Sequence, residues 1–325
     1  MERKHKRMRL SIVVPCYNEE KNVVPFYNKT VEIFGEQMQD AELVFVNDGS
    51  KDNTLTELKK IAAESKYKVR VVNFSRNFGK EAGLLAGLEH AKGDYVAIID
   101  ADLQQNPKYI LDMLKILDEN PEYDGVAAYQ EQRKEGAVLT WFKDCFYKLI
   151  NSITEVEFVK SASDFRVLNR KMVDAVLALP ERCRFSKGIF SWIGFKVYYM
   201  PYEVEDRFAG NSKWSFWKLA AYAINGIVAF SDKPLIISSL LGFLLCVIAV
   251  LMMGYTVIKT ILFGDPVAGY PTLISVILLM SGIQLFCIGI IGQYLAKIYT
   301  ESKERPVYIL DEVIENELTI DLSKF

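Results

Sequence analysis

The chain has 325 residues, half of them hydrophobic, which is enough for a domain with a full core and a second, smaller unit. The 39 basic and 41 acidic side chains give a net charge of −2, which supplies no electrostatic basis for binding nucleic acid. The five cysteines are widely scattered without the paired spacing of a zinc site or a disulfide framework, and this favours a reducing, cytoplasmic setting.

The first hundred residues alternate between apolar strands and helices. Strands are predicted at residues 10–15, 41–47, 68–74 and 94–100, and the helices between them end near residues 38, 65 and 91. Thr54 and Glu57 have the spacing of a capping box, which predicts that Thr54 caps the second helix. This alternation is typical of a mostly parallel sheet with helices on both faces.

Polar clusters follow each of these four strands. They occupy residues 17–19, 48–50, 75–77 and 100–102. In parallel α/β sheets ligands bind beyond the carboxyl ends of the strands, so the four clusters are expected to form one site.

The fourth strand ends in Asp100 and Asp102, followed by Gln104. Two carboxylates and an amide oxygen can converge on a hard divalent cation, which would neutralise a diphosphate. The alternative is an ordinary strand followed by an acidic helix start, with Asn106 as the N-cap and Pro107 as the first helical residue. The pattern of this stretch alone does not decide between them.

The middle of the chain is less regular. Strands are predicted at 123–129, 164–168 and 196–201, and a helix at 139–150. A basic, glycine-containing loop at 207–213 precedes an apolar helix at 214–230, whose aromatic start suits a position in a membrane interface.

Residues 234–258 and 272–296 contain no charged side chain. As helices they would each measure about 37 Å, more than the roughly 30 Å of a bilayer's hydrocarbon core, so both are predicted to span a membrane rather than form buried core helices. Basic residues flank the pair, whereas the connecting loop carries Lys259 against Asp265. The flanking residues are Lys213, Lys218, Lys233, Lys297, Lys303 and Arg305. The positive-inside rule therefore places both chain termini in the cytoplasm.

Small residues recur along both predicted spans. They are Ser238, Gly242, Cys246 and Gly254 in the first, and Ser275, Gly282 and Gly289 in the second. Such stripes suggest packing within the hairpin or between subunits, although a lipid-facing coincidence fits them as well.

Five motifs stand in a fixed order along the chain. They are Val14-Pro-Cys-Tyr-Asn-Glu19, Asn47-Asp-Gly-Ser50, Ser75-Arg-Asn-Phe-Gly79 with Ala91-Lys-Gly-Asp94, Asp100-Ala-Asp-Leu-Gln104, and Arg207-Phe-Ala-Gly-Asn-Ser-Lys213. Together they resemble the polyprenyl-phosphate glycosyltransferases of glycosyltransferase family 2, the group of dolichol-phosphate mannose synthase and bactoprenol glucosyltransferase. The resemblance covers residues 10–213, and the two-span tail is similar to the bactoprenol enzymes.

The resemblance implies a nucleotide-diphospho-sugar transferase fold of the GT-A type and a four-part chain. Residues 1–212 would form the cytoplasmic catalytic domain, 213–232 an interfacial amphipathic helix, 233–297 two transmembrane helices and 298–325 a cytoplasmic tail. From about Tyr308 the tail alternates apolar and acidic residues, so it could add an edge strand or remain flexible. The protein would be a multi-pass inner-membrane protein and a homo-oligomer, a tetramer by family analogy.

The resemblance also implies roles for individual residues. Nucleotide-sugar binding would fall to Pro15, Tyr17, Glu19, Asp48, Asp100, Ala101, Arg207 and Lys213, and Mg²⁺ or Mn²⁺ to Asp100, Asp102 and Gln104. The catalytic residues would be Asp102, Asp164 and Arg207. Many relatives carry an acid where this chain has Asn47, so the base or ribose contacts can differ here.

Asp164 matches the position of the proposed base in these enzymes. The expected acceptor, a phosphomonoester, has a second pKa near 6 and is largely dianionic at neutral pH, so a dedicated base is optional. Asp164 can instead orient the acceptor, pair with Arg166 or serve the fold.

The expected reaction is inverting transfer of one hexose, foremost glucose from UDP-glucose, onto undecaprenyl phosphate at the cytoplasmic membrane face. The alternatives are another donor, such as GDP-mannose or UDP-GlcNAc, and a membrane-anchored nucleotide-sugar binding protein without turnover.

Overall fold

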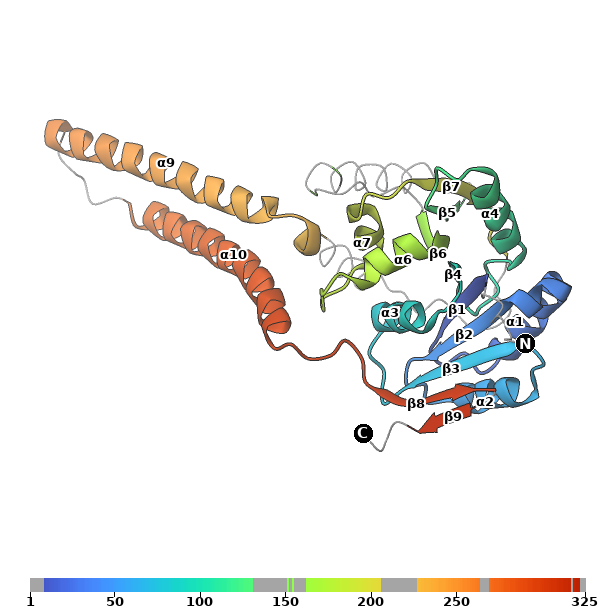
Figure 1. Cartoon of the computed structure of the whole chain (residues 1–325). Helices are drawn as coiled ribbons and strands as arrows, with labels where there is room; N and C mark the ends of the chain where they lie inside the picture. Colours follow the sequence, from blue (N-terminus) through green and yellow to red (C-terminus); the bar gives the residue numbers. More distant parts are fainter. Residues whose placement is uncertain are drawn as a thin grey trace.

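The computed structural model describes residues 9–130, 151, 154, 162–205, 227–263, 269–316 and 318–321. These residues form an α/β domain from which two long helices project side by side (Figure 1). The predicted helix at 139–150 and the loop at 207–213 lie outside the described residues, as does most of the predicted interfacial helix.

A nine-stranded sheet of order β7-β5-β6-β4-β1-β2-β3-β8-β9 forms the centre of the domain. The strands are β1 (Leu10–Cys16), β2 (Ala41–Asn47), β3 (Lys68–Phe74), β4 (Tyr95–Ile98), β5 (Gly125–Gln130), β6 (Ala162–Asn169), β7 (Val197–Tyr202), β8 (Leu310–Glu315) and β9 (Leu318–Asp321). The central strands β3, β2, β1 and β4 are parallel, as predicted. On the flanks β6 and β8 run antiparallel to β4 and β3, so the sheet is mixed rather than mostly parallel.

Helices cover both faces of the sheet, which confirms the predicted layering. One face carries α1 (Val23–Phe34), η1 (Gly35–Asp40), α2 (Thr54–Glu64) and α4 (Lys108–Glu119). The other carries α3 (Lys80–His90), α6 (Arg170–Leu177) and α7 (Ser186–Trp192). Successive strand residues point to opposite faces, so Ile12 and Val14 enter the first core and Val13 the second.

The predicted capping box at Thr54 is wrong. Thr54 is the first residue of α2 rather than its cap, and its hydroxyl accepts the backbone N–H of Glu19 at 2.8 Å. The hydroxyl also donates to Asp52 Oδ1 at 2.5 Å, and the same carboxylate oxygen accepts the Thr54 N–H at 3.0 Å. The N-cap of α2 is Asn53, whose side chain makes no capping hydrogen bond, and the preceding Asp52 accepts the N–H of Thr54 because the threonine hydroxyl is engaged with the loop after β1.

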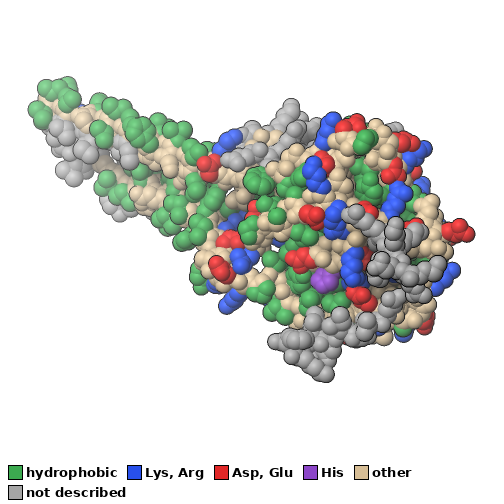
Figure 2. All heavy atoms as spheres, in the orientation of Figure 1, with side chains coloured by type: hydrophobic (Ala, Val, Ile, Leu, Met, Phe, Trp, Pro, Cys, Tyr) green, Lys and Arg blue, Asp and Glu red, His purple; other side chains and the backbone are tan. Residues whose placement is uncertain are grey.

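The projecting helices are α9 (Lys233–Phe263) and α10 (Tyr270–Ser302), and both predicted spans lie within them. At 1.5 Å per residue they are about 47 and 50 Å long. Their large apolar side chains are exposed, for example Phe243 at 70% and Leu285 at 70%, and Figure 2 shows hydrophobic atoms along the hairpin. Both helices are long and apolar enough to cross a membrane. The buried-core alternative is wrong because almost none of their apolar stretches is buried by the part of the chain that the structure describes.

The glycines of the small-residue stripes do not mediate contact between α9 and α10, whereas Ser238 does, since its carbonyl oxygen lies 4.0 Å from the Cys287 thiol of α10. A methyl group added at Gly242, Gly254, Gly282 or Gly289 would meet no atom within 4 Å among the described residues. Close packing within one hairpin is therefore not the function of these glycines, and packing between subunits stays a prediction.

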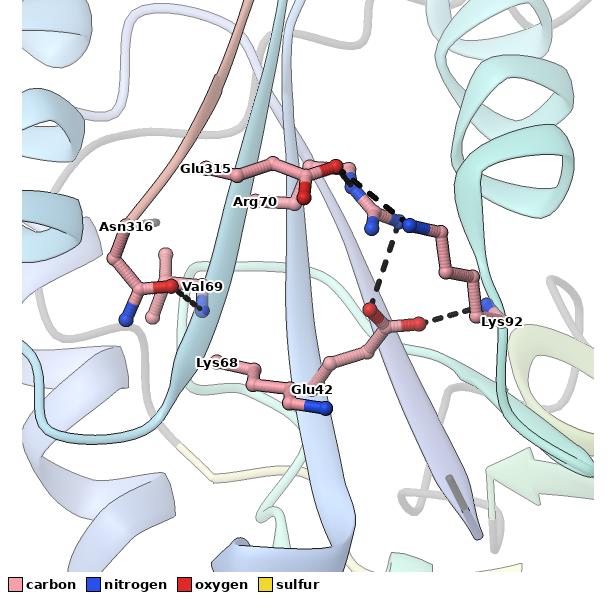
Figure 3. A pocket seen from close by; sticks show the side chains of 7 residues that line it. All are labelled: Glu42, Lys68, Val69, Arg70, Lys92, Glu315 and Asn316. Carbon is pink, nitrogen blue, oxygen red and sulfur yellow. Dashed lines mark hydrogen bonds and ion pairs between the residues drawn. The ribbon is translucent and has the colours of Figure 1, made fainter. Parts of the chain in front are cut away.

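After α10 the chain returns to the domain, and β8 and β9 extend the sheet beyond β3 (Figure 1). Of the two alternatives for the tail, the edge strand is right. A charged network at the opposite end of β3 from the polar clusters fixes this edge (Figure 3). Arg70 Nε donates to Glu315 Oε1 at 2.6 Å, and its guanidinium lies 3.5 Å from Glu42. Glu42 also accepts from Ser11 Oγ at 2.6 Å and from Lys92 N at 2.7 Å.

Changing Arg70 to Met should destabilise the domain strongly. Arg70 and Glu42 are 5% and 3% exposed, so the substitution would leave a buried carboxylate without its cation, at a cost of about 3–5 kcal/mol. In the full-length protein in detergent we expect the midpoint of thermal unfolding to fall by about 10 °C.

The matched control is Lys115→Met, which removes the exposed pair with Glu119 at 3.8 Å. It should shift the midpoint little, since such pairs contribute under about 0.5 kcal/mol. Adding Glu42→Gln to Arg70→Met should recover part of the loss. Equal midpoints for the Arg70 and Lys115 variants would contradict the assignment.

Candidate functional site

The loops after β1 and β2 are joined by hydrogen bonds. Asn18 N donates to Ser50 Oγ at 2.9 Å, and Asn18 Oδ1 accepts from Lys51 N at 2.8 Å. Asn18 has a φ of 53°, in the left-handed region that asparagine tolerates better than most residues. The first two polar clusters therefore form one continuous rim at the carboxyl edge of the sheet.

Asp48 joins this rim to the third cluster. Its carboxylate accepts the N–H groups of Phe78 at 2.6 Å and Gly79 at 2.9 Å, and the Asn77 side-chain amide at 2.9 Å. Burial raises the pKa of Asp48, while the Phe78 and Gly79 amides oppose that rise. In this conformation the carboxylate holds the loop after β3, and its contact with a nucleotide stays a prediction.

Gly49 lets the two loops approach closely. Its φ is 57°, and a Cβ at this position would lie 2.2 Å from the backbone carbonyl carbon of Arg76. Only glycine fits such a position without displacing the neighbouring backbone. The close approach of the two loops therefore requires the glycine of the Asn47-Asp-Gly-Ser50 motif.

A three-membered charge cluster lies where β4 ends. The ammonium of Lys80, the first residue of α3, lies 2.9 Å from Asp100 Oδ1 and 2.9 Å from Asp164 Oδ2. The Lys80, Asp100 and Asp164 side chains are 42%, 35% and 20% exposed, so the cluster is open to solvent on one side. We call these residues the Lys80 cluster.

The contacts within the cluster shift the pKa values of Lys80 and Asp164. Burial alone would raise the pKa of Asp164, but the positive charges of Lys80 and Lys187, with a further contribution from Arg166, hold this pKa well below its usual range. Burial alone would lower the pKa of Lys80, because it disfavours the charged ammonium. The negative charges of Asp100 and Asp164 outweigh this effect and raise the pKa of Lys80. Lys80 and Asp164 are therefore both charged at neutral pH.

The direction of β6 brings Asp164 into this cluster. β6 runs antiparallel to β4 with Arg166 opposite Ile98, so the first residues of β6 lie at the carboxyl end of β4. The Arg166 guanidinium donates to the Ser163 carbonyl at 2.9 Å and stacks 4.0 Å from the Phe190 ring. Arg166 lies next to Asp164 as predicted, since its Nε donates to the Asp164 backbone carbonyl at 3.3 Å, and the Asp164 carboxylate forms an ion pair with Lys80.

Gln105 holds the Asp100 loop in place. Its side-chain Oε1 accepts Asp100 N at 3.1 Å, and its Nε2 donates to Ser163 Oγ at 3.2 Å and to Asp100 Oδ2 at 3.4 Å. Gln105 is buried. A buried amide with both ends bonded fixes the carboxylate-bearing loop relative to β6.

The predicted metal ligands Asp100, Asp102 and Gln104 lie in one turn. Gln104 N donates to Asp102 Oδ1 at 3.1 Å, and Leu103 between them has a φ of 60°. Their side chains offer only oxygen donors of the kind that Mg²⁺ and Mn²⁺ prefer, so the donor set fits such an ion. Among the described residues no three His, Cys, Asp or Glu side chains could hold a metal by themselves. The remaining ligands would have to be substrate oxygens or water.

The other predicted site residues divide into two groups. Pro15, Tyr17 and Glu19 lie half-buried on the rim, and Ala101 is buried beneath it. Arg207 and Lys213 lie outside the described residues, so their predicted phosphate contacts stay predictions.

The sequence analysis did not identify Lys80 as a site residue. A signal was present, because a lysine at the first position of a helix opposes the positive end of the helix dipole. Such a placement indicates that the charge is needed for another contact. Neither Asp100 nor Asp164 lies near Lys80 in the sequence, so the partners could not be read from local spacing.

Comparison with known proteins identifies the family to which the chain belongs. Residues 11–177 match the model of glycosyl transferase family 2, and residues 233–298 match that of the GtrB C-terminal hairpin. The chain is 40% identical over 305 residues to the bactoprenol glucosyl transferase of Shigella phage SfV, covering 93% of this chain and 98% of that protein. It is 41% identical over 304 residues to the putative glycosyltransferase CsbB of Bacillus subtilis strain 168, covering 93% and 91%.

The family match spans β1 to α6, which includes the rim, the turn with Asp102 and the Lys80 cluster. The hairpin match coincides with α9 and α10. The chain therefore belongs to glycosyl transferase family 2 and carries a GtrB-type hairpin at its C-terminal side.

Proposed function

We propose that the protein transfers glucose from UDP-glucose to polyprenyl phosphate, with undecaprenyl phosphate as the expected acceptor. The observation that carries this proposal is the Lys80 cluster, which lies at the carboxyl edge of the sheet in a family 2 domain. The same chain carries an apolar helical hairpin that is long enough to cross a membrane. The relatives named bactoprenol glucosyl transferase support the sugar and the lipid.

The reaction requires little acid–base chemistry from the protein. An oxygen of the acceptor phosphate attacks C1 of glucose, and the bond from C1 to the diphosphate oxygen breaks, with UDP leaving as the anion. Attack from the opposite face inverts the anomeric carbon. Because a phosphomonoester is largely dianionic at neutral pH, no proton has to be removed from the nucleophile.

Asp164 is better suited to positioning than to proton transfer. A general base is most effective with a pKa near the working pH, and Lys80 keeps the Asp164 pKa far below that range. We infer that the Lys80 cluster fixes the orientation of Asp100 and Asp164 around the reacting phosphates. The ammonium also offsets part of the carboxylate charge that would otherwise repel two anionic substrates.

Asp100, Asp102 and Gln104 would hold Mg²⁺ or Mn²⁺, which when bound stabilises the charge that develops on the departing diphosphate. Arg207 and Lys213 would add positive charge from the loop above the site. Arg207 can bind a phosphate through two parallel hydrogen bonds, whereas Lys213 provides a point charge.

Membrane attachment gives the domain access to an acceptor that cannot leave the bilayer. We propose that α9 and α10 span the inner membrane with the domain and both termini in the cytoplasm, since the flanking basic residues outnumber those of the connecting loop. A homo-oligomer, a tetramer by family analogy, is part of the same proposal.

Changing Asp102 to Asn should abolish glucose transfer while the protein remains folded, because a metal ligand is lost without a change of volume. The full-length protein is incubated with labelled UDP-glucose, undecaprenyl phosphate and Mn²⁺, and label in the lipid phase is measured. We expect the variant below about 1% of the wild-type rate, and the wild type to be inactivated by a chelator.

The matched control is Asp112→Asn, the same charge change on the exposed face of α4. It should transfer glucose at the wild-type rate. Near-normal turnover of the Asp102 variant would refute the metal assignment. Absence of lipid-phase label in the wild type with UDP-glucose, GDP-mannose and UDP-GlcNAc would refute the transferase proposal and favour a binding protein.

Changing Asp164 to Asn should lower kcat about 100-fold, and the deficit should be constant from about pH 6 to 9. A lost base would instead be compensated as the pH rises. Lys80→Met should give a similar loss, and the double variant should be no worse than either single one, because the two residues act as a unit. A deficit that disappears at high pH would establish a base role instead.

The orientation can be tested with a single cysteine in place of Val267, in a chain whose native cysteines are changed to Ser. An impermeant maleimide should label it in intact spheroplasts, because the loop between the spans faces outward. In a second variant of the same cysteine-free chain, a cysteine that replaces Lys303 should react only in inside-out vesicles. The reverse pattern would show that the orientation is wrong.

A further inference from the structure

A pocket of about 420 Å³ lies at the junction between the catalytic domain and the end of α10. Its domain side includes Glu81 in the first turn of α3 and the pair Arg184 and Phe185 just before α7. We call it the junction pocket. Its size lies within the range of small-molecule sites, about 300–1,000 Å³.

The helix side of the junction pocket is one face of α10. Gln293, Ala296, Lys297 and Thr300 line it at spacings of three, four and seven residues, which places them together along a helix. α10 is about 50 Å long and exceeds the roughly 30 Å hydrocarbon core. If α10 spans the membrane as proposed, with residues 272–296 in the hydrocarbon core, its last turns and the pocket lie at the depth of the lipid headgroups.

Hydrogen bonds fix the two sides of the junction to each other. The carboxylate of Glu301 on α10 accepts the backbone N–H groups of Arg182 at 3.0 Å and Cys183 at 2.7 Å. The Arg182 side chain donates to the Arg305 carbonyl at 3.0 Å. On the α9 side, Tyr294 donates to the Ser231 carbonyl at 2.6 Å. The pocket is thus a formed feature of the junction.

The lining combines two cations with neutral donors. Arg184 donates to the carbonyls of Leu179 and Val176, each at 3.1 Å, so the end of α6 holds its guanidinium in place. Lys297 lies across from it on α10. The one acid, Glu81, accepts the N–H of Ser186 at 2.8 Å and also its hydroxyl. A fixed guanidinium, an ammonium, a hydroxyl and an amide suit a phosphate group.

The junction pocket lies next to the Lys80 cluster. Glu81 follows Lys80 in α3, and Lys187, one of the cations that lower the pKa of Asp164, follows Ser186. A phosphate held in the pocket would be separated from the Lys80 cluster by the first turn of α3. The pocket therefore connects the headgroup depth of the membrane with the candidate site.

We propose that the junction pocket binds the phosphate of the polyprenyl phosphate acceptor and holds it at the membrane surface before transfer. This inference rests on the proposed function for the identity of the lipid. Lys297 and Arg184 contact the phosphate, while the isoprenyl chain stays along α10 in the bilayer.

The test uses the full-length protein in phosphatidylcholine nanodiscs that contain undecaprenyl phosphate, with no sugar donor. Lys297→Gln should weaken binding of the lipid about tenfold, and Lys297→Arg should restore it. In transfer assays Lys297→Gln should raise the KM for the lipid by a similar factor and leave the KM for UDP-glucose unchanged.

The matched control is Lys303→Gln, at the same end of α10 but outside the pocket, where its ammonium lies 3.9 Å from the Tyr299 ring. It should bind the lipid as the wild type does. Equal binding by the wild type and Lys297→Gln, or an equal loss in Lys303→Gln, would overturn the proposal.

Competition separates the lipid from free phosphate. Inorganic phosphate at the concentration of the lipid should not displace it, and displacement would overturn the lipid assignment. Because binding is measured without a donor, a wild type that binds the lipid through Lys297 but transfers no sugar would refute the proposed function while supporting the pocket.

Discussion

One ammonium group, that of Lys80, holds together the part of the rim on which the proposed chemistry depends. Without it, the Asp100 and Asp164 carboxylates would repel each other, and the pKa of Asp164 would lose the positive charge that contributes most to lowering it. With it, three elements meet at fixed distances: the first turn of α3, the loop after β4 and the start of β6. Gln105 and the Asp48 network stabilise the loops on either side of this contact.

The charge balance explains why such a site needs further cations. If the diphosphate and the phosphomonoester bind here as proposed, they meet the carboxylates of Asp100, Asp102 and Asp164, and the single ammonium of Lys80 offsets only part of that charge. A divalent ion at Asp102 and a basic loop would supply the rest. A nucleophile that carries its own charge removes the need for a base, so the same carboxylates can serve to position the reactants.

The hairpin is tied to the domain at both of its ends. Just before α9, the Phe230 ring packs against Phe185 of the domain with the ring centroids 6.1 Å apart, and α10 ends beside the loop that Glu301 holds. The chain then re-enters the sheet as β8, where Asp311 accepts from Asn73, which in turn accepts from Asn47 at the end of β2. Two attachments restrict the domain's rotation relative to the hairpin more than a single linker would, and they keep the junction pocket formed.

The sequence by itself determined the central alternation of strands and helices, the polar clusters on one edge and the two apolar spans. These features depend on local periodicity and composition, which a single chain displays directly. Only the tertiary structure decided the mixed direction of the sheet, the strand formed by the tail and the true role of Thr54. It also placed Lys80 between Asp100 and Asp164, which are 20 and 84 residues away. Contacts of that kind depend on which strands pair and in which direction, and hydrophobic patterning specifies the faces of a strand but not its neighbours.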